Sequence, residues 1–306
     1  MDFVKNFKRW HIIAVSVIAV AAILLGVFGA LRTGVDYAGG TLMTVNVQSE
    51  FDESVIASAL NQNGVFGARV QTAGDRKTLA EIRIQYSGDI AALSSPLEQT
   101  IANTYPGAKV ISTEPITAAH ADKLFFSLFV PAVSACIIGF LYARVRYGLS
   151  AAISAGLTPL YSFALFLGIA EAIRLTVNTP FIGAALLTAV CSVAGVILLF
   201  ERLKEGSKDD PQADKHRRAL TNAGIQGGIP NLLALFGALV VVLIGLAIFG
   251  SAAMREFALP GIIGIVVCAF FSIFLAAPLW VVLQESAERN PAVQKKKAKK
   301  KDIKKK

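Results

Sequence analysis

A set of polar side chains lies inside long apolar runs, where a hydroxyl or an amide either lines a water path or bonds to a neighbouring helix. Its members are Ser154, Thr158, Ser162, Thr188, Ser192, Asn231 and Ser272. Bonding between helices is the commoner use, and Thr158, Ser192 and Asn231 are the candidates for a polar lining. Ionisable side chains at mid-membrane usually mark a proton or ion path, and the middle of every apolar run lacks them.

No residue pattern in the sequence indicates catalysis, a metal site or a cofactor. The longest polar stretch, residues 32–123, has no cysteine and no G-x-S-x-G, H-E-x-x-H or P-loop motif. Cys136, Cys191 and Cys268 lie in separate apolar runs without metal-ligand spacing, so we interpret them as small packing residues. We therefore expect no enzyme, no catalytic residue, no bound metal and no cofactor.

The composition is that of a membrane protein. Of 306 residues, 54% are hydrophobic and 17% are charged, and the mean hydropathy is +0.58, whereas soluble domains carry about 25% charged residues. A bilayer span needs about 20 predominantly apolar residues. The segments that meet this requirement are 11–31, 124–142, 149–173, 180–200, 229–249 and 258–283, which predicts six transmembrane helices.

The basic residues predict the orientation of these spans. With both termini in the cytoplasm, the cytoplasmic side holds 21 of the 30 Lys and Arg residues and the other side holds 9, as the positive-inside rule requires. The cytoplasmic parts are then the N-terminal tail 1–10, the loop 201–228 and the basic tail 284–306, together with a short turn after the second span. The first span is too long for a signal-peptide core, so we expect an uncleaved anchor.

The end of the tail, residues 295–306, reads KKKAKKKDIKKK and is too highly charged to fold on its own. Three roles stay open for it. It can serve as a topology anchor, contact anionic lipid headgroups, or contact ribosomal RNA.

The segment between the first two spans, residues 32–123, alternates in the manner of a small α+β domain. Strands are predicted at 41–48, 65–72, 79–86 and 109–113, and helices at 52–62 and from 90 to about 104. In the first strand, Met43, Val45 and Val47 share one face. The order β-α-β-β-α-β is that of a ferredoxin-like split βαβ sandwich, here placed outside the cytoplasm.

Two short motifs flank these elements. After the first span the chain reads GVDYAGGT from residue 34, where Gly39 and Gly40 permit a tight turn and Asp36 is expected to cap it through an Asx-type bond. The fourth span closes with FERLKE from residue 200. We expect Glu201 with Arg202, and Glu171 with Arg174, to form pairs at the membrane surface.

In this arrangement of one span, an α+β domain and five further spans, the motifs resemble those of the SecF proteins of the SecD/SecF protein-export family, in the resistance-nodulation-division superfamily. The residues matching the family motif after the first span are Gly34, Val35, Asp36, Gly39, Gly40 and Thr41, and those at the end of the fourth span are Phe200, Glu201, Arg202 and Glu205. Segments 255–259 and 272–279 extend the resemblance, which covers about residues 1–285.

The resemblance implies assistance to preprotein translocation across the bacterial cytoplasmic membrane. Its implied partners are a SecD-like subunit, the SecYEG channel, the preprotein in transit, and YajC-type and YidC-type proteins. Where the family carries polar residues within its spans, this chain has Ala194-Gly195, Thr158-Pro159 and Asn231. An altered or absent intramembrane proton relay in this chain is therefore expected.

Two alternatives to this function remain from the sequence. One is a small-molecule or lipid transporter of the same superfamily, although a single six-span half with one small domain argues against it. The other is a structural anchor that acts through the basic tail.

Overall fold

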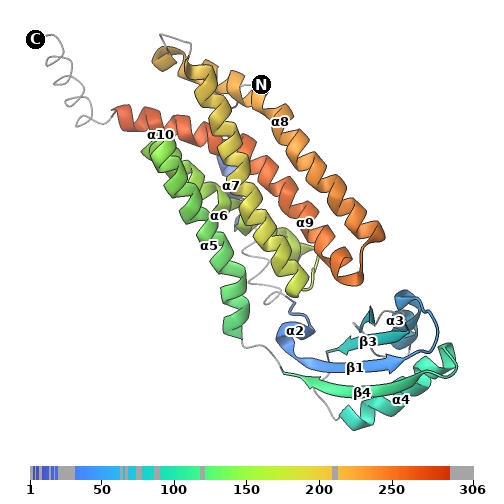
Figure 1. Ribbon diagram of the computed structural model, residues 1–306. Helices are drawn as coiled ribbons and strands as arrows, with labels where there is room; N and C mark the ends of the chain where they lie inside the picture. The colour runs from blue at the N-terminus through green and yellow to red at the C-terminus, as the bar shows by residue number, and fades with distance from the viewer. Residues whose placement is uncertain are drawn as a thin grey trace, which may run out of the picture.

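In the computed structural model, a bundle of long helices is joined to a small α+β domain that lies beyond one end of the bundle (Figure 1). We refer to that end as the domain end and to the opposite end as the far end. The structure describes residues 3, 5–6, 9–13, 15–16, 18–19, 32–62, 65, 68–73, 78–85, 90–117, 121–208 and 213–289. Most of the predicted first span and the whole Lys-rich segment 295–306 lie outside the described residues.

The α+β domain follows a single helical turn and contains a four-stranded sheet. Its elements are α2 (Val35–Ala38), β1 (Gly40–Asn46), α3 (Glu53–Gln62), β2 (Arg69–Ala73), β3 (Leu79–Ile84), α4 (Ile90–Thr104) and β4 (Lys109–Ile116). The strands lie in the order β2-β3-β1-β4, and neighbours are antiparallel. After α2, therefore, the elements follow one another as β-α-β-β-α-β.

One face of this sheet forms the hydrophobic core of the domain. Alternate residues of β1 point to the same face, and the helices α3 and α4 supply apolar side chains from their inner stripes. The buried residues include Met43, Val45, Val47, Ile56, Leu60, Ile82, Leu97 and Ile101. The shared face of Met43, Val45 and Val47 was predicted correctly, because the period-2 pattern is a local property of the sequence.

The bundle consists of α5 (Ala121–Arg146), α6 (Leu149–Ala172), α7 (Thr179–Lys208), α8 (Ala213–Phe249), α9 (Ala252–Phe271), a π-helical turn η1 (Ser272–Ala276) and α10 (Ala277–Arg289). Within the described residues, five stretches are long and apolar enough to cross a membrane. They are Phe126–Arg146, Leu149–Ala172, Thr179–Glu205, Arg217–Phe249 and Ala253–Ala287. The five stretches overlap the second to sixth predicted spans.

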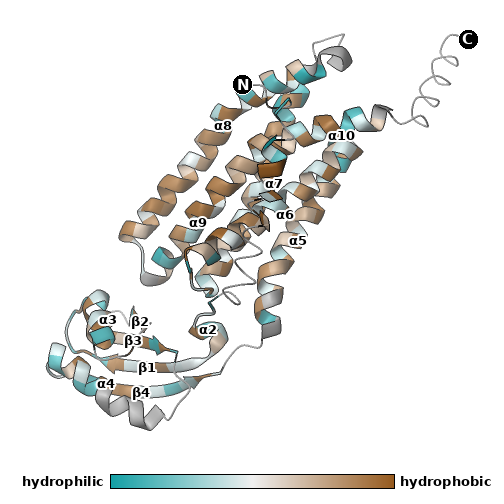
Figure 2. Ribbon diagram, turned by 180° about the vertical axis from the view of Figure 1, so that it is seen from behind, coloured by the Kyte–Doolittle hydropathy of each residue, from teal (hydrophilic) through white to brown (hydrophobic). Residues whose placement is uncertain are grey.

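Two of these helices leave most of their apolar surface uncovered. On α8 the side chain of Val241 is 68% exposed, and on α5 that of Ile138 is 62% exposed. Figure 2 shows the outer helices of the bundle in the colours of hydrophobic residues. Apolar surface of this extent needs an apolar environment, so the protein is embedded in a membrane.

The predicted loop 201–228 is largely helical in its described part. Helix α7 continues to Lys208 and α8 begins at Ala213. The two extensions pack closely, because a β carbon on Gly224 would lie 2.6 Å from Cδ2 of Leu203. Burial of Leu203 and Ile225 stabilises these extra helical turns, a long-range effect that hydropathy alone does not reveal.

The sixth predicted span contains a local change of helical type. The five-residue π-turn η1 ends two residues before Pro278, which lies in the first turn of α10. Proline lacks a backbone N–H and disturbs the regular hydrogen-bond ladder, and π-turns within helices are a common way to absorb such a disturbance. The turn is braced from α6, where Ser154 Oγ donates to the carbonyl oxygen of Ala276 at 2.6 Å.

Candidate functional site

Asp36 joins the α+β domain to the start of a bundle helix. One carboxylate oxygen, Oδ2, accepts hydrogen bonds from the backbone N–H of Thr179 at 3.2 Å and from its hydroxyl at 2.9 Å. The other oxygen lies 3.2 Å from Nη1 of Arg83 on β3. The Asx-type bond expected within the turn is replaced by these long-range contacts, so Asp36 links α2, β3 and α7.

A second set of contacts connects β2 to the first turn of α9. Nε of Arg69 lies 2.8 Å from Oε1 of Glu256, and Oε2 of Glu256 accepts a hydrogen bond from the amide of Asn178 at 2.8 Å. Asn178 also accepts from the backbone N–H of Phe181 at 2.9 Å, as a cap at the start of α7. The starts of α7 and α9 are therefore both tied to the open face of the sheet.

Backbone bonds complete this junction between the domain and the bundle. Thr33 and Val177 form a parallel bridge, with Gly34 N–H donating to the carbonyl oxygen of Val177 at 2.8 Å and Val177 N–H donating to that of Arg32 at 2.7 Å. A β carbon on Gly34 would lie 3.2 Å from that Val177 oxygen. The chain thus enters the domain along the loop that connects α6 and α7.

The remaining residues of the predicted motif shape this turn rather than offer reactive groups. Val35 and Thr41 are buried. Gly39 has φ of 78°, in the left-handed region that favours glycine. At Gly40 a β carbon would overlap the carbonyl oxygen of Ile84 on β3, so this position requires glycine.

The carboxyl of Asp36 has a lowered pKa. Partial burial by itself would raise the pKa, but the hydrogen bonds from Thr179 and the positive charges of Arg83 and Arg69 outweigh that effect and hold the pKa below its ordinary value of 3.8. Asp36 is therefore charged at neutral pH.

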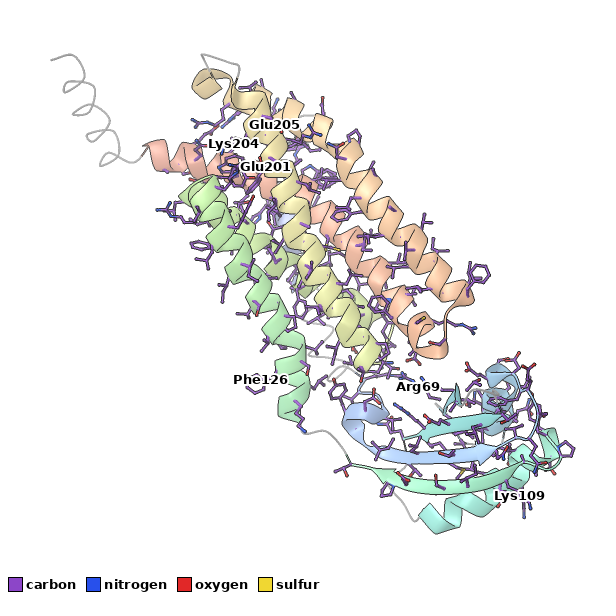
Figure 3. The ribbon with its side chains drawn as sticks, viewed as in Figure 1. Arg69, Lys109, Phe126, Glu201, Lys204 and Glu205 are labelled. Carbon is purple, nitrogen blue, oxygen red and sulfur yellow. The ribbon has the colours of Figure 1, made fainter. Side chains whose placement is uncertain are left out.

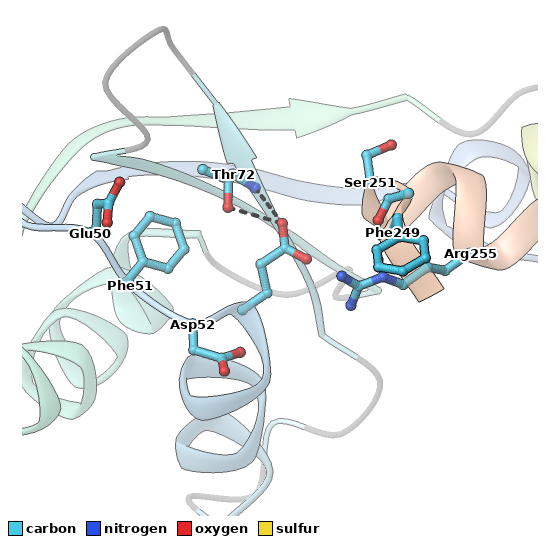
Figure 4. Close-up of a pocket in the computed structure, with 9 residues that line it drawn as sticks. Glu50, Phe51, Asp52, Thr72, Phe249, Ser251 and Arg255 are labelled. Atoms are coloured by element: carbon cyan, nitrogen blue, oxygen red, sulfur yellow. Dashed lines mark hydrogen bonds between the residues drawn. The ribbon is translucent and has the colours of Figure 1, made fainter. Parts of the chain in front are cut away.

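Two clefts lie between the α+β domain and the bundle, and junction residues line the first of them. A cleft of about 470 Å³ lies among Asp36, Arg69, Arg83, Thr179 and Glu256, together with neighbouring side chains. A larger cleft, of about 830 Å³, separates the segment Glu50–Glu53 and Thr72 from the turn between α8 and α9. Figure 4 shows the guanidinium of Arg255 and the ring of Phe249 across this cleft from the acidic segment, and the bonds from Thr72 to Glu53.

The motif at the end of the fourth predicted span lies at the far end of the bundle, away from the junction (Figure 3). Glu201 pairs with Arg146 of α5, Nε to Oε1 at 3.1 Å, and not with Arg202 as expected. Arg202 instead lies 3.1 Å from Glu205. The expected pair of Glu171 and Arg174 is present, at 3.1 Å.

Aromatic packing surrounds this far-end motif. The ring of Phe200 is buried, with its centroid 4.7 Å from that of Trp280 and 5.6 Å from that of Tyr147. Lys204 lies over the ring of Tyr147 at 5.3 Å. The motif therefore holds together the ends of α5, α7 and α10.

The three candidates for a polar lining separate into two places. Thr158 and Ser192 are buried in the middle of the bundle and are connected through Ser162, whose Oγ lies 3.0 Å from the Thr158 carbonyl oxygen and 3.1 Å from Ser192 Oγ. Asn231 lies at the far end. Its side-chain oxygen, in the orientation that satisfies both groups, accepts from Nε and Nη2 of Arg202 at 2.8 Å.

Ser272 in the bundle is a buried hydroxyl that has no hydrogen-bond partner in the described part of the chain. It faces Gly195, where a β carbon would lie 2.5 Å from Ser272 Oγ and 3.0 Å from Cζ of Phe236. Close contact between α7 and the α9–η1 helix therefore fills this part of the bundle. Among the described residues, no group of three or more His, Cys, Asp and Glu side chains is placed to hold a metal ion.

Sequence reasoning missed Arg69, Arg83, Asn178 and Glu256. One signal was accessible once the strand register was known, because Arg69 and Arg83 lie directly opposite each other on β2 and β3. Like charges in that position repel unless anions from elsewhere neutralise them. Asp36 and Glu256 supply those anions.

The sequence of this chain is similar to a known protein family and to several of its members. The family model described as "Protein export membrane protein SecD/SecF, C-terminal" matches residues 97–286. The protein translocase subunit SecF of Thermodesulfovibrio yellowstonii is 23% identical over 288 residues, which cover 92% of this chain and 94% of that protein. SecDF of Bacillus subtilis is 24% identical over 297 residues, which cover 92% of this chain and 38% of that protein.

A solved structure shows the same fold. The crystal structure of SecDF in its super-membrane-facing form superposes with a TM-score of 0.75 at 20% sequence identity, over 96% of this chain. The match covers 40% of the solved chain, so this chain spans about two fifths of that protein.

Proposed function

Because this chain belongs to the SecD/SecF family of protein export membrane proteins, we propose that it is a SecF-like subunit of a Sec-type protein translocase. The observation that carries the proposal is the match to a SecF subunit over nearly the whole length of both proteins. The alternative of a small-molecule or lipid transporter is not favoured by these relatives.

We place the protein in the bacterial cytoplasmic membrane with six spans, both termini in the cytoplasm, and a ferredoxin-like domain outside. The uneven distribution of Lys and Arg supports this orientation. The strand order β2-β3-β1-β4 supports the ferredoxin-like assignment. The domain end of the bundle then faces outward and the far end faces the cytoplasm, with boundaries near those predicted from hydropathy.

In this role the junction transmits movement between the outer domain and the membrane helices. Asp36 and Arg69 hold the starts of α7 and α9 through Thr179 and Glu256. A displacement of either helix therefore displaces the sheet, and a polypeptide that contacts the sheet is moved in turn. The work is translocation assistance without covalent chemistry.

The polar side chains inside the bundle indicate whether this chain can carry protons to drive translocation. Thr158, Ser162 and Ser192 bond to one another or to backbone, and Gly195 is packed tightly against Ser272. The described middle of the bundle offers hydroxyls and no carboxylate. Proton coupling, where it occurs, is therefore assigned to a SecD-like partner, and this chain has an altered or absent relay.

The proposed partners follow from the family. They are a SecD-like subunit, the SecYEG channel, the preprotein in transit, and YajC-type and YidC-type proteins. The SecDF protein of a relative is one longer chain, and this chain covers 38% of it. The uncovered remainder supports a separate SecD-like partner for this chain. Anionic lipids or the ribosome are assigned to the Lys-rich tail.

A secretion assay tests this function. In a strain whose own SecF-type subunit is replaced by this chain, we expect the export of a signal-peptide reporter to be restored. Arg83→Gln, which breaks the contact with Asp36, is expected to reduce export, whereas Lys109→Gln, which removes a cation at the distant end of the sheet (Figure 3), is expected to preserve it. Failure of the unaltered chain to restore export, with normal amounts in the membrane, would contradict the proposal.

A further inference from the structure

A third cleft, of about 510 Å³, lies beside the junction. Its lining comprises Arg32, Thr33, Gly34, Val35, Arg69, Gln85 and Thr176. It shares only Arg69 with the cleft at Asp36. The volume lies in the range of small-ligand sites, about 300–1,000 Å³.

The chemistry of this lining is that of a site for an oxyanion. Its lining residues include two arginines, two threonines and one glutamine, and none of the described lining residues carries a carboxylate. Guanidinium groups bind phosphate oxygens through two parallel N–H donors. Nε of Arg69 already pairs with Glu256. We therefore expect Arg32 to be the main cation that binds an oxyanion in this cleft.

Arg32 is held in position although its side chain is exposed to solvent. Its backbone carbonyl accepts from Val177 N–H at 2.7 Å, and the next residue, Thr33, bridges to the same strand segment. Among the described residues it makes no ion pair. The backbone that carries this guanidinium is therefore anchored at the junction.

The geometry points to the phosphate of an anionic lipid headgroup as the occupant of this cleft. In the topology proposed above, Arg32 directly follows the first span, 11–31, and lies at the level of the outer headgroups, where lipid phosphates are concentrated. A Lys or Arg near an anionic surface contributes about 1 kcal/mol of attraction. The bound lipid fixes the outer domain to the membrane surface, and this binding does not depend on the role in export.

Native mass spectrometry of the full chain in mild detergent tests the site, with added phosphatidylglycerol or phosphatidylcholine as the probe. We expect phosphatidylglycerol to be retained in preference to phosphatidylcholine. Arg32→Gln should lower phosphatidylglycerol retention by about fivefold, and Arg32→Lys, which keeps the charge but loses the fork, should retain an intermediate amount. Arg255→Gln removes an exposed cation at the same end of the bundle and should behave like the unaltered chain.

Three results would overturn the assignment. The first is equal retention of the two lipids by the unaltered chain, and the second is unchanged retention in Arg32→Gln at a normal melting temperature. The third comes from inorganic phosphate tested alone: binding that requires Arg32, without retention of phosphatidylglycerol, would assign the cleft to the free ion. Each of these readouts is separate from reporter export.

Discussion

At the scale of single residues, Asp36 connects three elements, α2, β3 and α7. The side chain of Asp36 is 19% exposed and that of Arg83 is 33% exposed, so solvent screens part of their attraction. Fully exposed ion pairs contribute about 0–1 kcal/mol, and hydrogen bonds to charged groups contribute about 1.5–3 kcal/mol. The two bonds from Thr179 are therefore expected to matter more than the ion pair.

A double-mutant cycle on Asp36→Asn and Arg83→Gln measures the ion pair alone. We expect a coupling free energy of about 1 kcal/mol in thermal or denaturant unfolding of the detergent-solubilised chain. The matched control is the exposed pair of Arg202 and Glu205, whose side chains are 52% and 56% exposed and whose coupling should be about 0.3 kcal/mol. Additive effects at Asp36 and Arg83 would refute the contribution of this pair.

The lowered pKa of Asp36 predicts how the junction responds to acid. Because the folded-state pKa lies below the ordinary value of 3.8, the charged form stabilises the folded state above that pH, and the stabilisation is lost as the pH falls through the lowered value. The difference in melting temperature between the unaltered chain and Asp36→Asn should therefore be constant from pH 7 to about 5 and shrink below pH 4. A difference that persists at low pH would contradict this assignment.

Gly40 gives a steric prediction at the same scale. Gly40→Ala places a methyl group against the carbonyl of Ile84 and should destabilise the protein by about 1–3 kcal/mol. Gly245→Ala in α8 meets no atom within 4 Å and should be neutral or stabilise its helix by up to about 1 kcal/mol. Thermal unfolding compares the two, and equal effects would show that the turn tolerates a side chain.

At the scale of elements, the close contact of α7 with the α9–η1 helix requires a glycine, Gly195, on α7. Gly195→Ala brings a methyl group against Ser272 Oγ and Phe236, and overpacking of this kind costs about 1–3 kcal/mol. Ser272→Ala removes a buried hydroxyl that has no partner among the described residues. It should be neutral by itself and should restore part of the stability lost in Gly195→Ala, as measured by melting temperature; absence of such rescue would argue against this contact.

The elements themselves were largely predictable, because their signals are local. The alternation around Met43 and Val45 and the apolar runs of the bundle were read directly from neighbouring residues. The extension of α7 and α8 into 201–228 was missed because it depends on the packing of Leu203 against Gly224. The pairing of Glu201 with Arg146, and not with the expected Arg202, was also missed. It depends on where α5 ends, since Arg146 lies 55 positions away in the sequence.

At the scale of the whole molecule, the junction was the part that sequence patterns could not provide. Asp36 meets residues 47 and 143 positions away, and the pairing requires both the strand register and the placement of the bundle. The motif around Asp36 was recognised, but its contacts were not. On this account, the α+β domain is fixed by these contacts to the membrane helices of a SecF-like export subunit.

Purification of the tagged chain from its native membrane in mild detergent, followed by identification of co-eluting proteins, tests that account most directly. We predict that a SecD-like chain elutes with it in fixed ratio, and that the SecYEG channel is enriched. Elution of this chain alone or only with copies of itself, under conditions that preserve other Sec complexes, would contradict its assignment as a SecF-like subunit.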